Sequence, residues 1–215
     1  MITKFPFWKD LTEEEKAYTA KCCVTKDYPK GSYIHSGRED CLGPSIIIKG
    51  EARVCLLSEE GREITLYRLY PGDCSILSAS CIMDKITFDT HIIAQTDCTL
   101  LTILPGAFKK LSENNLHARC FVYELATERF SSVVWTMQNI IFKGFDRRLA
   151  GFLVEEYDRT GKSEIKLTHE AIANYISSAR EVVARMVKRF AEEGLIEQKR
   201  GSIKIIDIDA LRDLA

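Results

Sequence analysis

Two arginines and a glutamate carry the most specific chemistry in this sequence. At 100° per residue, Arg180, Glu181 and Arg185 share one side of a helix, opposite an apolar side that contains Val183 and Val187. Arginine can donate two hydrogen bonds to the O6 and N7 edge of guanine, and a carboxylate can accept one from the amino group of cytosine. Because a glutamate repels phosphate, its place among arginines favours base reading over nonspecific attachment. These residues predict a helix that reads base edges in the major groove of double-stranded DNA.

Glu181 has a second interpretation, which is purely structural. Ser178 and Glu181 have the spacing of a capping box, in which each side chain satisfies a free backbone amide at a helix start. The two roles can coexist.

Neighbouring segments predict how this helix is placed. Thr168 has the residue type of an N-cap and opens a preceding helix that extends to Ile176, and a short break at 177–178 separates the two helices. After Gly194 the chain has the pattern of a β-hairpin with Lys199 and Arg200 near its tip. Such a tip would contact phosphates, although an isolated basic turn would be a solvated loop. The predicted DNA-backbone contacts are Thr168, His169, Ser178, Lys188, Arg189, Lys199, Arg200 and Ser202.

A long helix without glycine or proline is predicted over 116–141. Its apolar or small residues recur in alternating steps of four and three, which is a heptad seam, and the helix would be about 40 Å long. We expect a homodimer through this seam; the alternative is a core helix of a monomer. A second apolar set, Phe121, Leu125, Trp135 and Phe142, is expected to face the N-terminal domain. The predicted seam consists of Leu116, Cys120, Tyr123, Thr127, Phe130, Val134, Met137 and Ile141.

The first 110 residues show short β-type runs separated by turn formers. Runs such as 45–48, 52–57, 64–69 and 99–104 are each four to six residues long. This spacing predicts an antiparallel barrel or sandwich.

The chain resembles the Crp/Fnr family of transcription regulators over nearly its whole length. The most specific match is to the family's winged helix-turn-helix, in Thr168–Ile176, Arg180–Arg185 and Gly194–Ile196. Upstream, Lys49-Gly-Glu51 and Tyr70-Pro-Gly-Asp73 are similar to the family's cyclic-nucleotide-binding-like barrel.

The resemblance implies an α+β fold with three parts. These are an effector-sensing antiparallel β-barrel of the double-stranded β-helix or jelly-roll type at 1–115, a dimerisation helix at 116–143 and the winged helix-turn-helix at 144–215. It implies that Arg180, Glu181 and Arg185 touch bases, and it makes RNA polymerase a candidate partner. One departure is Ser177, where the family often has glycine. Serine could adopt the left-handed conformation there at a cost of about 1 kcal/mol, or the turn could differ slightly.

The sequence leaves the cofactor and the effector unidentified. The cyclic-AMP-binding relatives carry an arginine in their phosphate cassette, whereas this chain has none between Arg68 and Arg119, so cyclic AMP is not the expected effector, although Lys85 could offer a weaker charge. Adjacent Cys22 and Cys23 are poorly spaced for an iron–sulfur cluster. Cys74 and Cys81 could form a thiol switch, bind metal or haem with His91, or simply line an apolar pocket. The candidate effector pocket consists of Gly72, Asp73, Cys74, Ser75, Ser80 and Cys81.

Composition narrows the function classes. A net charge of −1 argues against coating of nucleic acid or membrane, and eight cysteines without an export signal are expected to be reduced in the cytoplasm. No catalytic motif is present and the four histidines lack metal-ligand spacing, so we do not expect an enzyme and we assign no metal ligand. A barrel that regulates a protein partner through its C-terminal helices is the alternative, and a redox enzyme using Cys74 and Cys81 is a remote third.

Overall fold

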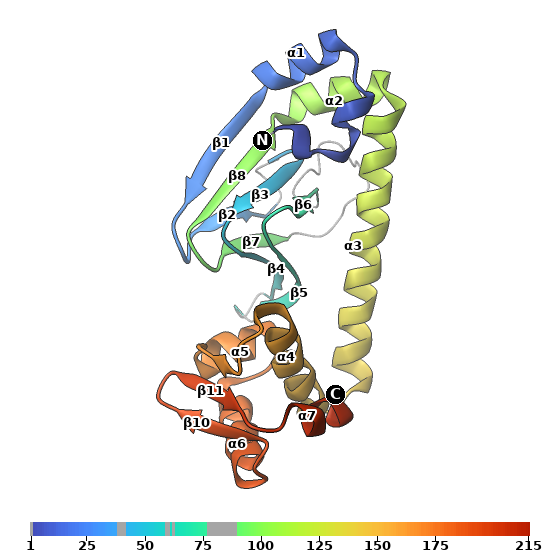
Figure 1. Cartoon of the computed structure of the whole chain (residues 1–215). Coiled ribbons are helices and arrows are strands. Elements are labelled where there is room, and N and C mark those ends of the chain that lie inside the picture. Colours follow the sequence, from blue (N-terminus) through green and yellow to red (C-terminus); the bar gives the residue numbers. More distant parts are fainter. Residues whose placement is uncertain (1, 38–41, 59–60, 62, 77–89) are drawn as a thin grey trace. The chain divides into compact units, whose positions relative to one another are not determined.

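The computed structural model describes residues 2–37, 42–58, 61, 63–76 and 90–215 (Figure 1). The chain divides into two compact units. Unit 1 comprises residues 1–62 and 66–134, and unit 2 comprises residues 63–65 and 135–215. Each unit has its own hydrophobic core and is described by itself.

Unit 1 is built from two antiparallel sheets with helices at its start and end. One sheet has the order β1-β8-β3-β6 and the other β2-β7-β4-β5. The α+β fold with an N-terminal antiparallel β-domain is therefore confirmed, as two four-stranded sheets that do not close into one barrel within the described residues. Its elements are η1 (Ile2–Lys4), η2 (Pro6–Asp10), α1 (Glu13–Lys21), β1 (Cys23–Tyr28), β2 (Tyr33–Ser36), β3 (Ser45–Lys49), β4 (Ala52–Leu57), β5 (Glu63–Leu69), β6 (Cys74–Ser75), β7 (His91–Ala94), β8 (Cys98–Ile103), α2 (Pro105–Asn114) and α3 (Leu116–Phe142). The start of β5, at 63–65, and the end of α3, at 135–142, belong to unit 2.

The two faces of the β3–β8 pair serve two different cores. Ile47 is paired with Leu100, and both belong to the cluster between the sheets. Their neighbours Ile46 and Leu101 are also paired, and they point to the opposite face, where η2, α2 and α3 supply Phe7, Phe108 and Phe121 among other residues. Because successive side chains of a strand point to opposite faces, one face of this pair packs against the other sheet and the other face packs against the helices.

Helix α3 buries one stripe and leaves the predicted seam uncovered. Ala118, Phe121, Val122 and Leu125 pack into unit 1. On the other side of the helix, Phe130 is 69% exposed. Every predicted seam residue is exposed except Val134, which is partly buried, and Ile141 near the end of the helix is 63% exposed. A single chain therefore presents an apolar stripe along α3.

The second apolar set on α3 was predicted only in part. Phe121 and Leu125 do pack into unit 1, but Trp135 is 61% and Phe142 is 79% exposed. Both residues come after Val133, which is the last α3 residue that packs against the hydrophobic cluster between the two sheets. The expectation that Trp135 and Phe142 face that domain was wrong.

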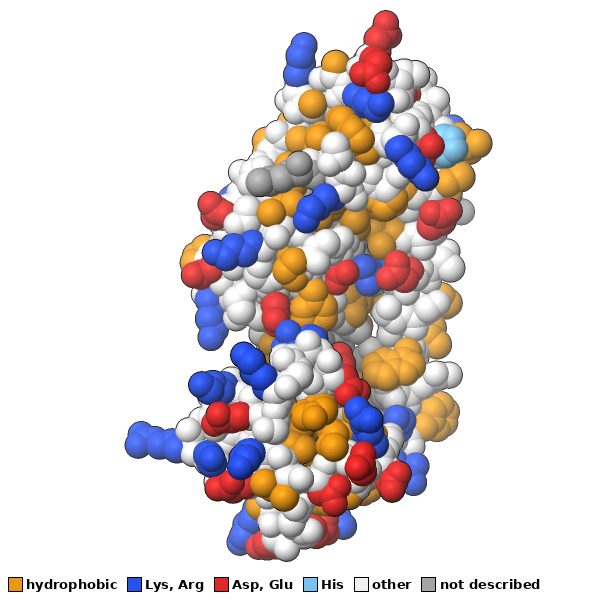
Figure 2. Space-filling model, viewed as in Figure 1, with side chains coloured by type: hydrophobic (Ala, Val, Ile, Leu, Met, Phe, Trp, Pro, Cys, Tyr) orange, Lys and Arg blue, Asp and Glu red, His pale blue; other side chains and the backbone are white. Residues whose placement is uncertain are grey.

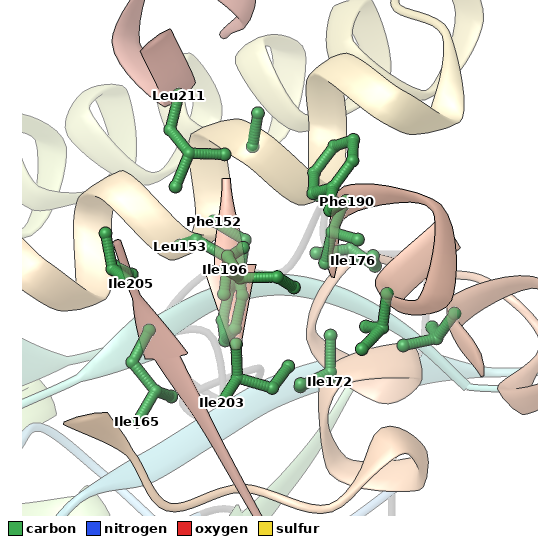
Figure 3. Packing of buried hydrophobic residues seen from close by; sticks show 14 of the residues in the cluster. Phe152, Leu153, Ile165, Ile172, Ile176, Phe190, Ile196, Ile203, Ile205 and Leu211 are labelled. Carbon is green, nitrogen blue, oxygen red and sulfur yellow. The ribbon is translucent and has the colours of Figure 1, made fainter. Parts of the chain in front are cut away.

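Unit 2 is a small helical domain with a three-stranded sheet in the order β10-β11-β9. In Figure 3, apolar side chains from its helices and strands converge on one centre, with Ile172, Phe190 and Ile196 among them. Val183, Val187 and Phe190 are fully buried, which confirms the predicted apolar side of their helix. The elements are α4 (Phe145–Thr160), β9 (Glu164–Ile165), α5 (His169–Tyr175), α6 (Arg180–Glu192), β10 (Ile196–Lys199), β11 (Ser202–Ile205) and α7 (Ile208–Leu214).

Among the described residues, no helix combines the length and the hydropathy that crossing a bilayer requires.

Candidate nucleic-acid interface

A tight turn joins α5 to α6. Thr168 caps α5 as predicted, because its hydroxyl accepts a hydrogen bond from the Ala171 amide at 3.1 Å. After α5, Ser177 takes a φ of 53° and is buried, and it is the non-glycine residue with positive φ among those described. The left-handed conformation expected at this position is therefore present without a glycine.

Replacing Ser177 with glycine should stabilise the protein. The left-handed region costs a residue with a Cβ about 1 kcal/mol relative to glycine, so we expect the free energy of unfolding to rise by up to about that amount. Chemical denaturation followed by circular dichroism measures the change. The matched control is Ser178→Gly, at a neighbouring position without positive φ, where glycine should be neutral or destabilising. A Ser177→Gly variant no more stable than Ser178→Gly would contradict the assignment of strain.

The start of α6 differs from the prediction. Its N-cap is Ala179, which makes no side-chain capping bond, and the Ala179 carbonyl accepts from the amides of Val182 and Val183. Because the helix begins one residue later than the capping-box spacing requires, Ser178 lies outside it and the predicted box with Glu181 is wrong. The carboxylate of Glu181 is therefore not occupied in capping its own helix.

The predicted reading face is exposed and unoccupied. Arg180, Glu181 and Arg185 are all exposed, and none of their side chains makes a hydrogen bond or ion pair with another described residue. By contrast, Lys188 lies 3.8 Å from the Glu192 carboxylate, and Arg189 Nε donates to Glu193 Oε1 at 2.7 Å. The hydrogen bond that Arg189 donates to the Glu193 carboxylate also raises the pKa of Arg189 above its usual value. Toward its C-terminus the cations of α6 are thus paired within the helix, whereas the reading arginines are free.

A cleft of about 330 Å³ brings together predicted contacts from three elements. Thr168 and His169 line it from the start of α5, Arg180 from α6, and Lys199 and Arg200 from the β10–β11 hairpin. In Figure 2, Lys and Arg side chains gather on the edge of unit 2 that carries α5 and this hairpin, with acidic side chains between them. The other predicted contacts on α6, Glu181, Arg185, Lys188 and Arg189, do not line the cleft.

Gln198 is a cleft residue that the sequence reasoning missed. It lines the cleft from β10, where it is exposed and paired with Ile203. A glutamine side chain can both donate and accept, as adenine reading requires, and its amide can also donate to a phosphate. Gln198 lies on the same face of β10 as the buried Ile196, two residues earlier, and this spacing is the signal that the sequence offered. The sequence of one strand does not show which of its polar residues lie next to a helix.

Ser202 differs from the other predicted hairpin contacts. It is only 9% exposed, and its hydroxyl donates to Glu164 Oε1 on β9 at 2.9 Å. A phosphate contact by Ser202 would require this bond to open, whereas Lys199 and Arg200 are exposed.

The candidate effector residues begin at a turn in unit 1. Gly72 has a φ of 100°, and the Asp73 carboxylate accepts from the Tyr70 amide at 2.8 Å. Burial raises the pKa of the Cys74 thiol to about 11, so this thiol is protonated at neutral pH and is a poor nucleophile. Ser75 is fully buried, and Ser80 and Cys81 lie outside the described residues. No group of three metal-ligating side chains occurs in the part of the chain that the structure describes.

Comparison with known proteins identifies both units. Residues 25–115 match the family model of the cyclic nucleotide-binding domain, and residues 147–214 match that of the Crp-like helix-turn-helix domain. A crystal structure described as a regulator of the Crp/Fnr family, from Eubacterium rectale, is 41% identical with a TM-score of 0.94, covering 99% of this chain and 98% of that one. The chain belongs to the Crp/Fnr family.

Curated Crp/Fnr relatives extend the likeness at lower identity. The transcriptional regulator SdrP of Thermus thermophilus is 26% identical over 79% of this chain and 82% of its own length. The cAMP-activated global transcriptional regulator CRP of Haemophilus influenzae is 24% identical over 81% of this chain and 80% of its own length. This Crp/Fnr protein is a DNA-binding transcription regulator with an N-terminal domain of the ligand-binding type.

Proposed function

We propose that this regulator binds a palindromic operator as a homodimer, with one α6 in each of two successive major grooves. The observation that carries the proposal is the reading face itself. Arg180, Glu181 and Arg185 are exposed and have no partner among the described residues, while the opposite side of α6 is fixed in the unit 2 core. A rigid helix with free arginines is suited to bidentate recognition of guanine.

The residues around the cleft are assigned to the sugar-phosphate backbone. Thr168 and His169 lie at the N-terminal end of α5, where backbone amides and the helix dipole favour an anion. Lys199 and Arg200 add positive charge from the hairpin. Such contacts fix the register of the protein on the duplex, so that α6 meets the same bases each time.

Dimerisation is assigned to the seam on α3. Its side chains recur at heptad spacing and are uncovered in the single chain, with Tyr123 at 64% and Phe130 at 69% exposure. Two copies packed along this stripe would remove it from water, which is the driving force of coiled-coil association.

Selection from a random pool of DNA duplexes tests the function. We expect an enriched palindrome whose half-sites lie about one helical turn, roughly 10–10.5 base pairs, apart. Failure to enrich any sequence would refute the proposal and favour the alternative, in which the C-terminal helices regulate a protein partner.

The hairpin cations should contribute affinity without specificity. Lys199→Ala and Arg200→Ala are each expected to weaken binding to operator and to random DNA by similar factors, and to reduce the slope of log affinity against log salt by about one. Fluorescence anisotropy at several salt concentrations measures both. Lys162→Ala, in the loop between α4 and β9 and outside the cleft, is the matched control. A loss confined to the operator would contradict the backbone assignment.

The N-terminal domain is proposed to sense an effector other than cyclic AMP. Its signal would change how two α3 helices pack and so reorient the reading faces. RNA polymerase is the proposed protein partner at a promoter, and the cytoplasm is the proposed location.

A further inference from the structure

Arg129 is a buried cation whose hydrogen-bonding groups are incompletely used. It lies on α3, is 8% exposed, and its Nη2 donates to the Cys74 carbonyl at 3.0 Å. Its Nε is buried and has no hydrogen-bond partner among the described residues. A guanidinium has five N–H donors and stays charged in proteins, so burying it with one well-made hydrogen bond is costly.

The nearest carboxylate does not neutralise this charge effectively. Glu128 Oε1 lies 3.5 Å from Arg129 Nη1, but the Glu128 side chain is 64% exposed. Water and salt screen such a pair, and the contact leaves Nε unsatisfied. A purely structural arginine would be expected to saturate its donors with carbonyls or with a buried carboxylate.

Tyr67 adds a second unsatisfied group beside Arg129. The guanidinium carbon lies 4.8 Å from the centre of the Tyr67 ring, and the Tyr67 hydroxyl is buried without a partner among the described residues. Burial raises the pKa of this phenol, which therefore keeps its proton and can donate it to an acceptor. The hydroxyl of Ser75, next to Cys74 on β6, is buried and unpaired as well. Buried polar atoms without partners are rare in native proteins, so these groups beside one arginine are suited to binding a ligand.

We propose that the effector carries an oxyanion, a carboxylate or phosphate group, which Arg129 binds together with the hydroxyl of Tyr67. The proposal rests on the proposed function, in which unit 1 senses an effector, and it specifies the chemical class of that effector. The charge would come from α3, in a chain that has no arginine between Arg68 and Arg119. Arginine is well matched to this role because its fork can donate two parallel hydrogen bonds to one oxyanion.

The position of Arg129 would connect this ligand to the dimer. The next residue, Phe130, is in the exposed seam, on a different side of the same helix turn. Arg129 and Phe130 are consecutive residues of one rigid helix. An oxyanion that draws the backbone at Arg129 toward itself would therefore also shift Phe130.

The test uses NMR of the Arg Nε–H groups in the full-length ¹⁵N-labelled protein. Inorganic phosphate and acetate are titrated separately at millimolar concentrations, with ionic strength held constant by chloride. We expect one Nε–H resonance to shift saturably with at least one probe and to be missing from the spectrum of Arg129→Gln. The stronger-binding probe distinguishes a phosphate from a carboxylate ligand. The absence of any saturable shift with either probe would overturn the proposal.

Variants separate ligand binding from a structural role. Arg129→Gln should weaken probe binding at least about tenfold, and Tyr67→Phe should weaken it about three- to tenfold. Because Tyr67→Phe removes a buried hydroxyl that has no partner among the described residues, it should not lower the melting temperature. Arg119→Gln is the control, since this α3 arginine already donates to the Ser112 and Glu113 carbonyls. Unchanged probe affinity in Tyr67→Phe, or an equal loss in Arg119→Gln, would refute the site. If operator selection still yields a palindrome, this inference fails alone and the proposed function stands.

Discussion

Replacing Arg180 or Arg185 with alanine is expected to weaken operator binding by about 1–3 kcal/mol per half-site, which is roughly 5- to 150-fold. Both side chains are exposed and free of partners among the described residues, so truncation should not disturb folding. The weaker binding should come with relaxed base preference at the positions that each arginine reads. Titration of operator variants, one base pair at a time, measures both effects.

The control for this experiment is another exposed arginine of unit 2. Arg212 on α7 donates to Asp158 at 2.6 Å and does not line the cleft, so Arg212→Ala should leave operator affinity unchanged. An equal loss on operator and on random DNA would contradict base reading by Arg180 and Arg185, because phosphate contacts weaken binding uniformly.

A glutamate at position 130 should separate the two copies of the protein. Phe130 lies in the middle of the α3 seam, where two copies of Phe130→Glu would place two desolvated like charges in an apolar contact. We expect a monomer in analytical ultracentrifugation. A monomer binds one half-site only, so we expect operator affinity to fall by roughly 10²–10⁴-fold because avidity is removed.

Ser131→Glu provides the matched change one residue farther along α3. Ser131 is exposed and lies beside the seam, at a heptad position that often carries glutamate or lysine in coiled coils. This variant should remain dimeric and bind the operator normally. A Phe130→Glu protein that stays dimeric would show that α3 does not provide the interface.

Regular periodicity explains what the sequence could predict. The apolar side of α6, with Val183 and Val187 fully buried, follows from a spacing of about 3.6 residues per turn, and the exposed stripe on α3 follows from its heptads. The cap at Thr168 and the left-handed Ser177 follow from local chemistry that a few neighbouring residues determine.

The misses depend on contacts between distant segments or on small shifts of a boundary. The N-cap of α6 falls at Ala179, one residue from the predicted position, and this shift removes the expected capping box. Trp135 and Phe142 have the spacing to face the sheets, but only the folded chain shows that the sheet contacts of α3 end at Val133. The burial of Arg129 could not be predicted from the sequence, because it requires strands β5 and β6 to pack against a helix that lies far from them along the chain.

The separate core of unit 2 has a genetic consequence. Substitutions on the exposed side of α6 leave that core and the α3 stripe intact, so a chain without its reading arginines should still fold and pair with an intact copy. Such a dimer, with one intact and one variant chain, would bind one half-site of the operator and fail to bind the other. In a cell that expresses both alleles, mutations at Arg180 or Arg185 are therefore expected to be dominant, whereas mutations that destroy the seam should be recessive.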